Sequence, residues 1–278
     1  MDLFSEIAFS TSKLVTRKYS TSFSKAVALL EPEKQDAIYS IYGFVRFADE
    51  VVDTFHQNNK KKLIDNFENA LNEALTEGIS LNPVLQSFSI TIKKYNIDMA
   101  YIDAFLASMR ADLNKQNYNT QTELNQYIYG SADVVGLMCL QVFTDGDKAM
   151  FETLKQPAIK LGSAFQKVNF LRDLKADTEG LHRIYLPQLS SGEFTENAKN
   201  EIIANISADF SEAREGISQL PGKSKLAVYL AYSYYKKLLN RLERTPAGKI
   251  TESRIRVPDS IKLMLLIFAK IRYKLGLI

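Results

Sequence analysis

Two pairs of aspartates carry the strongest chemical signal in the sequence. Asp49 and Asp53 stand four residues apart in one apolar segment, and Asp173 and Asp177 repeat that spacing in another. On a helix such residues share a face, where two like charges destabilise the helix by roughly 0.2–0.5 kcal/mol, and apolar neighbours raise this cost. Two such pairs therefore need a compensating cation. Mg²⁺ fits, because it prefers oxygen ligands and often sits between carboxylates and substrate phosphates.

Arginine and amide side chains extend both acidic faces. Arg46 precedes Asp49 by one helical turn, while Asn169 and Gln166 continue the face of Asp173 backwards. Facing helices of a bundle are a usual place for a metal site. A single acid pair is more often a solvated helix surface, but the two pairs with these neighbours predict a metal–diphosphate site between two helices.

Helical periodicity dominates the rest of the chain. Leu63, Ile64, Phe67, Leu71 and Leu75 form one apolar stripe, with charges opposite. We expect helices over 2–18, 33–56, 60–75, 82–95, 99–115, 121–143, 147–178, 195–218, 222–244 and 258–275, with a long non-helical stretch at 178–192. The prediction is an all-α fold of about ten helices in a single domain spanning residues 1–278.

Composition excludes several other classes. The 12 Gly and 7 Pro among 278 residues are too few for a turn-rich all-β chain or a disordered one. A single cysteine, Cys139, excludes an intramolecular disulfide, and two histidines nearly exclude a zinc cluster. We see no signal peptide, and the longest apolar run, 263–269, is too short to span a bilayer. We therefore expect a cytoplasmic protein, soluble or attached peripherally to the inner face of the membrane.

The net charge of +3 conceals a basic C-terminal region. Residues 221–278 hold 13 Lys and Arg against Glu243, Glu252 and Asp259, a local charge of +10. The expected helix 258–275 is apolar with basic flanks, and two interpretations stay open. It is a packed terminal helix whose cations reach outward, or it contacts an anionic membrane. No recognition motif accompanies the charge, so nucleic acid is not an expected partner.

Five segments together resemble the squalene/phytoene synthase family, and bacterial phytoene synthases most of all. They are Tyr19–Ser24 (YSTSFS), Arg46–Asp53 (RFADEVVD), Tyr127–Gly136 (YIYGSADVVG), Gln166–Asp177 (QKVNFLRDLKAD) and Arg183–Pro187 (RIYLP). They follow the family's order and spacing. The resemblance implies the all-α isoprenoid synthase fold, a helical bundle around a central cavity, and head-to-head condensation of two prenyl diphosphates.

The resemblance also implies a role for each matching residue. Mg²⁺, with Mn²⁺ as an alternative ion, would be held by Asp49 and Asp53 on one wall and by Asn169, Asp173 and Asp177 on the other. The residues implied to bind substrate are Tyr19, Ser20, Thr21, Ser22, Tyr42, Arg46, Gln166, Arg172, Tyr235 and Arg254. Tyr129 joins Arg46 and the four aspartates as an implied catalytic residue. Ser20 and Ser22 have a structural alternative, as helix N-caps.

The chain departs from the family pattern at three places. Glu50 stands where the family often has a second Asp, and we expect it outside the metal's ligand shell. Ala176 replaces a usual Glu, and Ser131-Ala132-Asp133 replaces the more usual Val-Ala-Gly. None of these changes removes an essential group.

The reaction that the resemblance implies is conversion of geranylgeranyl diphosphate to phytoene, through a cyclopropyl diphosphate and with release of diphosphate, in carotenoid biosynthesis. The main alternative is squalene or dehydrosqualene synthesis from farnesyl diphosphate. NADPH is expected only if the product is squalene. A remoter alternative is a non-catalytic relative that assists the assembly of a complex, but such a protein should have lost the acid pairs.

Overall fold

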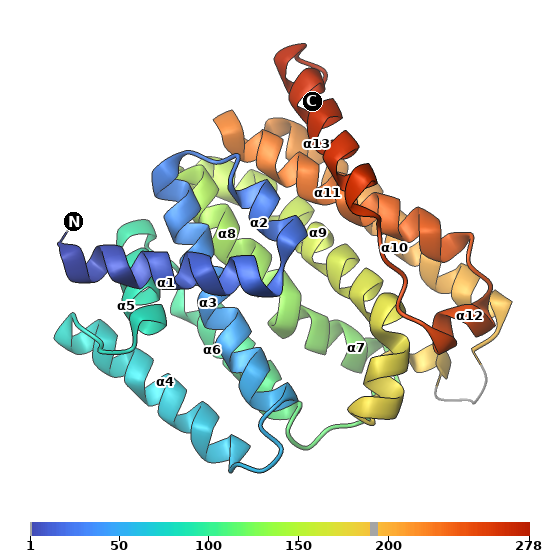
Figure 1. Ribbon diagram of the computed structural model, residues 1–278, viewed down its shortest axis with the longest axis horizontal. Coiled ribbons are helices and arrows are strands. Elements are labelled where there is room, and N and C mark those ends of the chain that lie inside the picture. Colours follow the sequence, from blue (N-terminus) through green and yellow to red (C-terminus); the bar gives the residue numbers. More distant parts are fainter. Residues whose placement is uncertain (1, 190–193) are drawn as a thin grey trace.

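The computed structural model describes residues 2–189 and 194–278, and helices make up most of both ranges (Figure 1). The helices are α1 (Leu3–Tyr19), α2 (Thr21–Val27), α3 (Pro32–Asp53), α4 (Lys60–Glu77), α5 (Pro83–Tyr95), α6 (Met99–Ala111), α7 (Gln121–Ile128), α8 (Val134–Thr144), α9 (Lys148–Lys175), α10 (Glu196–Gln219), α11 (Gly222–Glu243), α12 (Ala247–Glu252) and α13 (Asp259–Lys274). In the described ranges, extended backbone pairs at one isolated parallel bridge, between Asn117 and Ile184. The predicted all-α class is confirmed.

Most helices begin and end within a few residues of their predicted bounds, because the local signals act as expected. The Asn82 side chain caps α5 by accepting from the backbone N–H of Val84, and Pro83 is the first helical residue. Two helices were not predicted, α2 and α12, with 7 and 6 residues. Helices this short hold too few turns for a periodic apolar pattern.

Two predicted helices are confirmed, but each includes a wider, π-helical turn that the sequence did not predict. The segment 121–143 contains η1 (Tyr129–Asp133) between α7 and α8, and 147–178 ends in η2 (Ala176–Gly180). Both turns fall in segments that carry candidate site residues, as π-turns often do. The predicted non-helical stretch 178–192 holds a 3₁₀ turn, η3 (Pro187–Leu189), and its positions 190–192 lie outside the described residues.

Helix α3 is the centre of the first half of the bundle. Its Phe44 is fully buried and stacks on Phe88 of α5, with ring centroids 4.2 Å apart. Phe105 of α6 packs against the same ring at 5.5 Å. Burying each such side chain contributes about 1.5–3 kcal/mol, so α3 is anchored firmly before its last turns reach the candidate site.

Helix α9 is the centre of the second half, and its long run contains a proline. Pro157 lies inside α9, and the ring faces Gly216 of α10. A Cβ built at Gly216 would come within 2.3 Å of the Pro157 Cβ. The absent side chain of Gly216 therefore makes room for the proline, and α9 and α10 pack closely.

The segment Gln121–Thr144 is long and apolar enough to cross a membrane by length and composition alone. Of its most apolar window, 61% is buried inside the fold. Figure 1 shows α8 inside the bundle, where it contacts α3, α6 and α9. The apolar character of this segment thus matches its place in the core.

We predict that Gly216→Ala lowers the free energy of unfolding by about 1–3 kcal/mol, because the added methyl group clashes with Pro157. Chemical denaturation monitored by circular dichroism measures the change. Gly248→Ala in α12 is the matched control: no atom lies within 4 Å of a Cβ built there, and alanine favours the helix. Equal stability of wild type and Gly216→Ala would contradict the packing described here.

Candidate functional site

The first acid pair lies in the last turns of α3. A guanidinium nitrogen of Arg46 is 4.0 Å from the Asp49 carboxylate, and Arg46 also forms an ion pair with Glu50. The Arg46 guanidinium lies over the Tyr19 ring, 4.3 Å from its centroid. Arg46 is thus held between the end of α1 and the acidic face of α3, and Glu50 is occupied by this arginine.

The second acid pair spans the junction of α9 and η2. Arg172 donates its Nε–H to Asp173 Oδ1 at 3.0 Å. Arg254, from the segment between α12 and α13, reaches the same oxygen with its Nε at 2.7 Å. Asp177 lies one turn further, in η2, and is half-buried. Residues from two distant parts of the chain therefore meet at Asp173.

The two acid pairs lie near each other, because Arg183 contacts both the backbone carbonyl of Asp177 and the carboxylate of Asp53, each at 2.8 Å. Burial first, and then repulsion from Asp173 and Asp53, raises the pKa of Asp177 to about 7. Burial, followed by repulsion from Asp53, raises the pKa of Asp49 to about 7. Since Asp177 is sensitive to Asp53, the carboxylates of α3 and of α9–η2 share one region of excess negative charge.

Polar and aromatic side chains of α3, α9 and α11 lie beside the carboxylates. Tyr235 donates its hydroxyl to Asn169 Oδ1 at 3.2 Å, and the Asn169 amide donates to Gln166 at 3.4 Å. Tyr42 stacks on Phe23 of α2, with centroids 5.0 Å apart. Burial raises the pKa of Tyr42 to about 12, so its phenol keeps its proton at neutral pH.

Other candidate residues lie at or beyond the edge of this arrangement. The Ser20 hydroxyl caps α2 by accepting from the backbone N–H of Phe23 at 3.3 Å, which is the structural role considered for it. Thr21 and Ser22 form the first turn of α2. Tyr129, in η1, is 41% exposed, and none of its described contacts reaches either acid pair.

Arg183 is a site residue to which the sequence assigned no role. One of its guanidinium nitrogens donates to Asp53 Oδ1 at 2.8 Å, and the other donates to the backbone carbonyl of Asp112 at 3.1 Å. The Asn117–Ile184 bridge holds the backbone next to it. Arg183 is itself buried. Its one sequence signal was its place in the RIYLP segment, since the contact to Asp53 joins residues 130 apart in sequence.

Behind Arg183 lies a buried polar cluster that the sequence also did not reveal. Tyr127 donates its hydroxyl to Asp112 at 2.7 Å, and Tyr185 lies 3.2 Å from an Arg183 nitrogen. Burial raises the pKa of Asp112 to about 7, in spite of the nearby Arg183 charge. The other Asp112 oxygen and the Tyr118 hydroxyl are buried without a hydrogen-bond partner. This cluster supports Arg183, and through it Asp53.

The carboxylates of the two acid pairs fit a divalent cation that takes its remaining ligands from water and phosphate. In the described ranges, no three Asp, Glu, His or Cys side chains come close enough to enclose an ion. Each acid pair can therefore supply about two carboxylates, and Mg²⁺ usually takes only that many before water and phosphate oxygens fill its octahedron. Burial, and then repulsion between carboxylates, raises the pKa values of Asp49 and Asp177 to about 7, and a bound cation would offset both effects.

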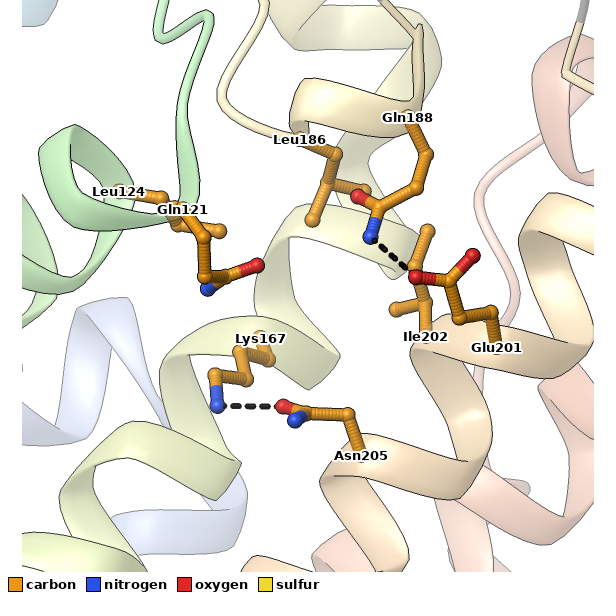
Figure 2. A pocket seen from close by; sticks show the side chains of 8 residues that line it. All are labelled: Gln121, Leu124, Lys167, Leu186, Gln188, Glu201, Ile202 and Asn205. Carbon is orange, nitrogen blue, oxygen red and sulfur yellow. Dashed lines mark hydrogen bonds between the residues drawn. The ribbon is translucent and has the colours of Figure 1, made fainter.

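A pocket of about 290 Å³ lies on a different face of α9, towards α10 (Figure 2). Lys167 donates to Asn205 at 2.6 Å across it, and Gln188 donates to Glu201 at 3.4 Å. Lys167 also forms an ion pair with the buried Asp209 at 2.6 Å. The polar groups of this pocket are thus largely paired with one another, and none of them belongs to the acid pairs.

The chain is similar in sequence and in fold to known proteins. Residues 16–260 match the squalene/phytoene synthase family. Phytoene synthase 3 of Zea mays is 31% identical over 95% of this chain, and phytoene synthase of Arthrospira platensis is 28% identical over 95% of it. The chain spans 66% of the maize protein and 93% of the Arthrospira protein. A crystal structure of a dehydrosqualene synthase in complex with ligand has a TM-score of 0.84 at 23% identity, covering 97% of this chain and 98% of that one.

We predict that Mg²⁺ raises the melting temperature more at pH 8 than at pH 5.5. Folded Asp49 and Asp177 have pKa values of about 7, whereas an unfolded aspartate has about 3.9. The metal-free fold therefore holds extra protons between about pH 4 and 7 and loses that stabilisation as the pH rises through 7. Above pH 7 both Asp49 and Asp177 are charged, and a bound cation would relieve the repulsion that they experience. Thermal unfolding with and without MgCl₂ measures both effects.

The variant Asp49→Asn/Asp177→Asn isolates these two groups. Without metal it should melt above wild type at pH 8, and its response to MgCl₂ should be small at both pH values. Asp103→Asn, an exposed aspartate of α6, is the control and should behave as wild type. An equal Mg²⁺ response in the double variant and wild type would place the cation elsewhere.

We predict that Arg183→Met destabilises the fold by about 3–5 kcal/mol, because it leaves buried Asp112 without its cation. Adding Asp112→Asn should recover more than about 1 kcal/mol if the two side chains interact. Arg110→Met removes ion pairs with Asp65 and Glu68 nearer the surface, and should cost about 1 kcal/mol or less. Denaturant titration of wild type, Arg183→Met, Asp112→Asn and the double variant gives the double-mutant cycle, and strictly additive effects would contradict the interaction.

Proposed function

The chain belongs to the squalene/phytoene synthase family, and from that premise we propose that it condenses two prenyl diphosphates head to head with a divalent cation. The family is one of prenyltransferases. One observation carries the proposal. Two aspartate pairs, Asp49 with Asp53 and Asp173 with Asp177, lie near each other, and arginine side chains lie beside both pairs. We propose further that residues 1–278 act as one catalytic domain.

The arginines are placed to bind and neutralise diphosphate. Arg46 lies beside Asp49, while Arg172 and Arg254 both contact Asp173. Guanidinium groups match phosphate oxygens in geometry as well as charge. A cation bound at the acid pairs supplies Lewis acidity to the leaving diphosphate. Together these arginines stabilise the charge that develops as the carbon–oxygen bond breaks.

The surrounding aromatic residues suit the carbocation that remains. Aromatic rings lie near the carboxylates and arginines of the site, namely those of Tyr42, Tyr235 and Phe165. The Tyr235 and Phe165 rings stack, with centroids 4.0 Å apart. A cation close to an aromatic face gains roughly 0.5–2 kcal/mol. The same rings exclude water, which would otherwise quench the cation. The second substrate's double bond then attacks, and proton loss closes the cyclopropane ring.

For the substrate, we propose geranylgeranyl diphosphate and the product phytoene, without NADPH. Support comes from the curated relatives, which are named phytoene synthases and include the Arthrospira protein that this chain spans almost completely. The plant relatives exceed this chain by about a third of their length, so they support the reaction less directly. Dehydrosqualene synthesis from farnesyl diphosphate is the second candidate, because a dehydrosqualene synthase shares the fold at a TM-score of 0.84.

We expect the purified protein with Mg²⁺ to form a colourless C40 triene from the C20 diphosphate whether or not NADPH is present. The C15 and C20 substrates are offered separately, each with and without NADPH, and products are identified by chromatography and mass. A C30 product alone would keep the chemistry and change the substrate. No product from a folded protein would favour the non-catalytic alternative.

Asp49→Asn/Asp173→Asn should lower turnover about 100–1,000-fold or more, because both walls lose a carboxylate. The control Asp103→Asn should turn over as wild type does. Circular dichroism confirms that each variant is folded. Turnover of the double variant near the wild-type rate would exclude the assigned site.

A further inference from the structure

Helix α13 exposes an apolar face that nothing in the described structure covers. Its inner face packs on α11, where Ala269 is buried with Leu230 and Tyr234. Its outer face carries side chains that are 45–66% exposed, namely Leu263, Met264, Ile267, Phe268, Ile271 and Leu275. Figure 1 shows α13 along the edge of the bundle, with the C-terminus beyond its last turn. We call these six residues the outer face of α13.

The outer face is continuous and bordered by cations. At about 100° per residue, its six residues occupy an arc of about 140° on the helix. Lys270 and Arg272 are exposed at the two edges of this arc, and Lys274, in the last turn, is exposed within it. Contiguous exposed apolar surface rimmed by polar groups marks an interaction site. Both the apolar residues and the charges must therefore be matched by the partner.

We propose that the outer face of α13 docks on an anionic lipid membrane. Large apolar side chains on such a helix enter the boundary between headgroups and acyl chains. Lys270, Arg272 and Lys274 then lie at the level of the headgroups, where each basic residue is attracted to anionic lipid. The last 58 residues carry a local charge of +10, which adds attraction over a longer range.

A second copy of the chain matches this surface less well. In a two-fold symmetric pairing of two outer faces, the same edges meet if the helices are antiparallel and opposite edges meet if they are parallel. Both edges are basic, so Lys270 and Arg272 of one copy approach cations of the other in either case. Like charges brought together oppose association. An anionic lipid surface instead offers opposite charge at both edges and apolar chains between them. Charge complementarity therefore selects the membrane.

The docking helix is joined directly to the candidate site. Arg254, which contacts Asp173, stands five residues before the first residue of α13. The Tyr234 hydroxyl of α11 donates to the backbone carbonyl of Lys262 at 3.2 Å and fixes the start of α13. If the proposed function holds, the short segment from Arg254 to Asp259 connects a residue of the site to the docked helix.

Flotation with lipid vesicles tests the proposal without any substrate. The full chain is mixed with phosphatidylcholine vesicles that contain either no anionic lipid or 30% phosphatidylglycerol. We expect binding to the anionic vesicles that weakens as salt is raised, and much weaker binding to the neutral ones. No binding to anionic vesicles would overturn the proposal, as would equal binding to both kinds.

Two pairs of variants separate the apolar and the charged contributions. Ile267→Ser/Ile271→Ser should lower the vesicle partition coefficient about a hundredfold, through loss of buried apolar surface. Its control is Ile79→Ser/Leu81→Ser, two exposed apolar residues between α4 and α5. Lys270→Glu/Lys274→Glu should lower it at least about tenfold. Its control is Lys62→Glu/Lys93→Glu, on α4 and α5. Variants and controls that behave alike would overturn the proposal.

Two further measurements distinguish this proposal from its rivals. Light scattering reports self-association: a dimer that Ile267→Ser/Ile271→Ser dissociates would assign the outer face to a second copy and overturn the proposal. Turnover in detergent-dispersed substrate reports the proposed function separately. Wild type that turns over without vesicle binding contradicts docking alone, whereas vesicle binding without turnover upholds docking and contradicts the proposed function.

Discussion

Repulsion among four aspartates is the constraint around which the rest of this molecule is arranged. Burial raises the pKa values of Asp49 and Asp177, and repulsion adds to this effect, from Asp53 on Asp49 and from Asp173 and Asp53 on Asp177. A fold tolerates this arrangement when other interactions hold the helices that carry it. The Phe44 stack anchors α3, and the contact of Pro157 with Gly216 anchors α9 to α10. Apolar packing elsewhere thus offsets the electrostatic cost at the site.

Arginines reduce this repulsion without removing it. Arg46 lies beside Asp49, Arg172 and Arg254 share Asp173, and Arg183 holds Asp53. Asp177 has no ion pair at its own carboxylate in the described structure and keeps a pKa of about 7. The site therefore attracts a cation and also presents guanidinium groups to an anion. A metal-bound diphosphate carries both signs of charge and matches both needs.

The sequence revealed the parts of the site that follow from local spacing. Aspartates four residues apart on a helix share a face wherever the helix lies, so both pairs could be predicted. The neighbours Arg46, Asn169 and Gln166 followed from the same geometry. Whether the two faces meet depends on how α3 and α9 pack, which periodicity does not encode. Here the resemblance to a family supplied the expectation.

Contacts made by loops could not be predicted in this way. Arg183 reaches Asp53 from an irregular segment, which is held by the backbone bridge to Asn117 and by the hydrogen bond from the Arg183 N–H to the Asp177 carbonyl. Asp112 and Tyr127 are polar residues in helical segments, and nothing local distinguishes them from surface residues. The π-turns η1 and η2 were also missed, because they differ from an α-helix by a small change of backbone that leaves the apolar pattern nearly intact.

The Arg183 contact also couples the site to a part of the chain far from it. Asp53 offers one carboxylate oxygen to Arg183, and the same guanidinium holds the carbonyl of Asp112 at the end of α6. A ligand that draws negative charge from Asp53 weakens the hold on Arg183, and so loosens the segment around Asn117 and Ile184. Binding free energies are reciprocal, so the order of that segment in turn sets the affinity at Asp53. Substitutions in this segment, which is far from the aspartates in sequence, would therefore change the affinity at Asp53 without contacting the ligand.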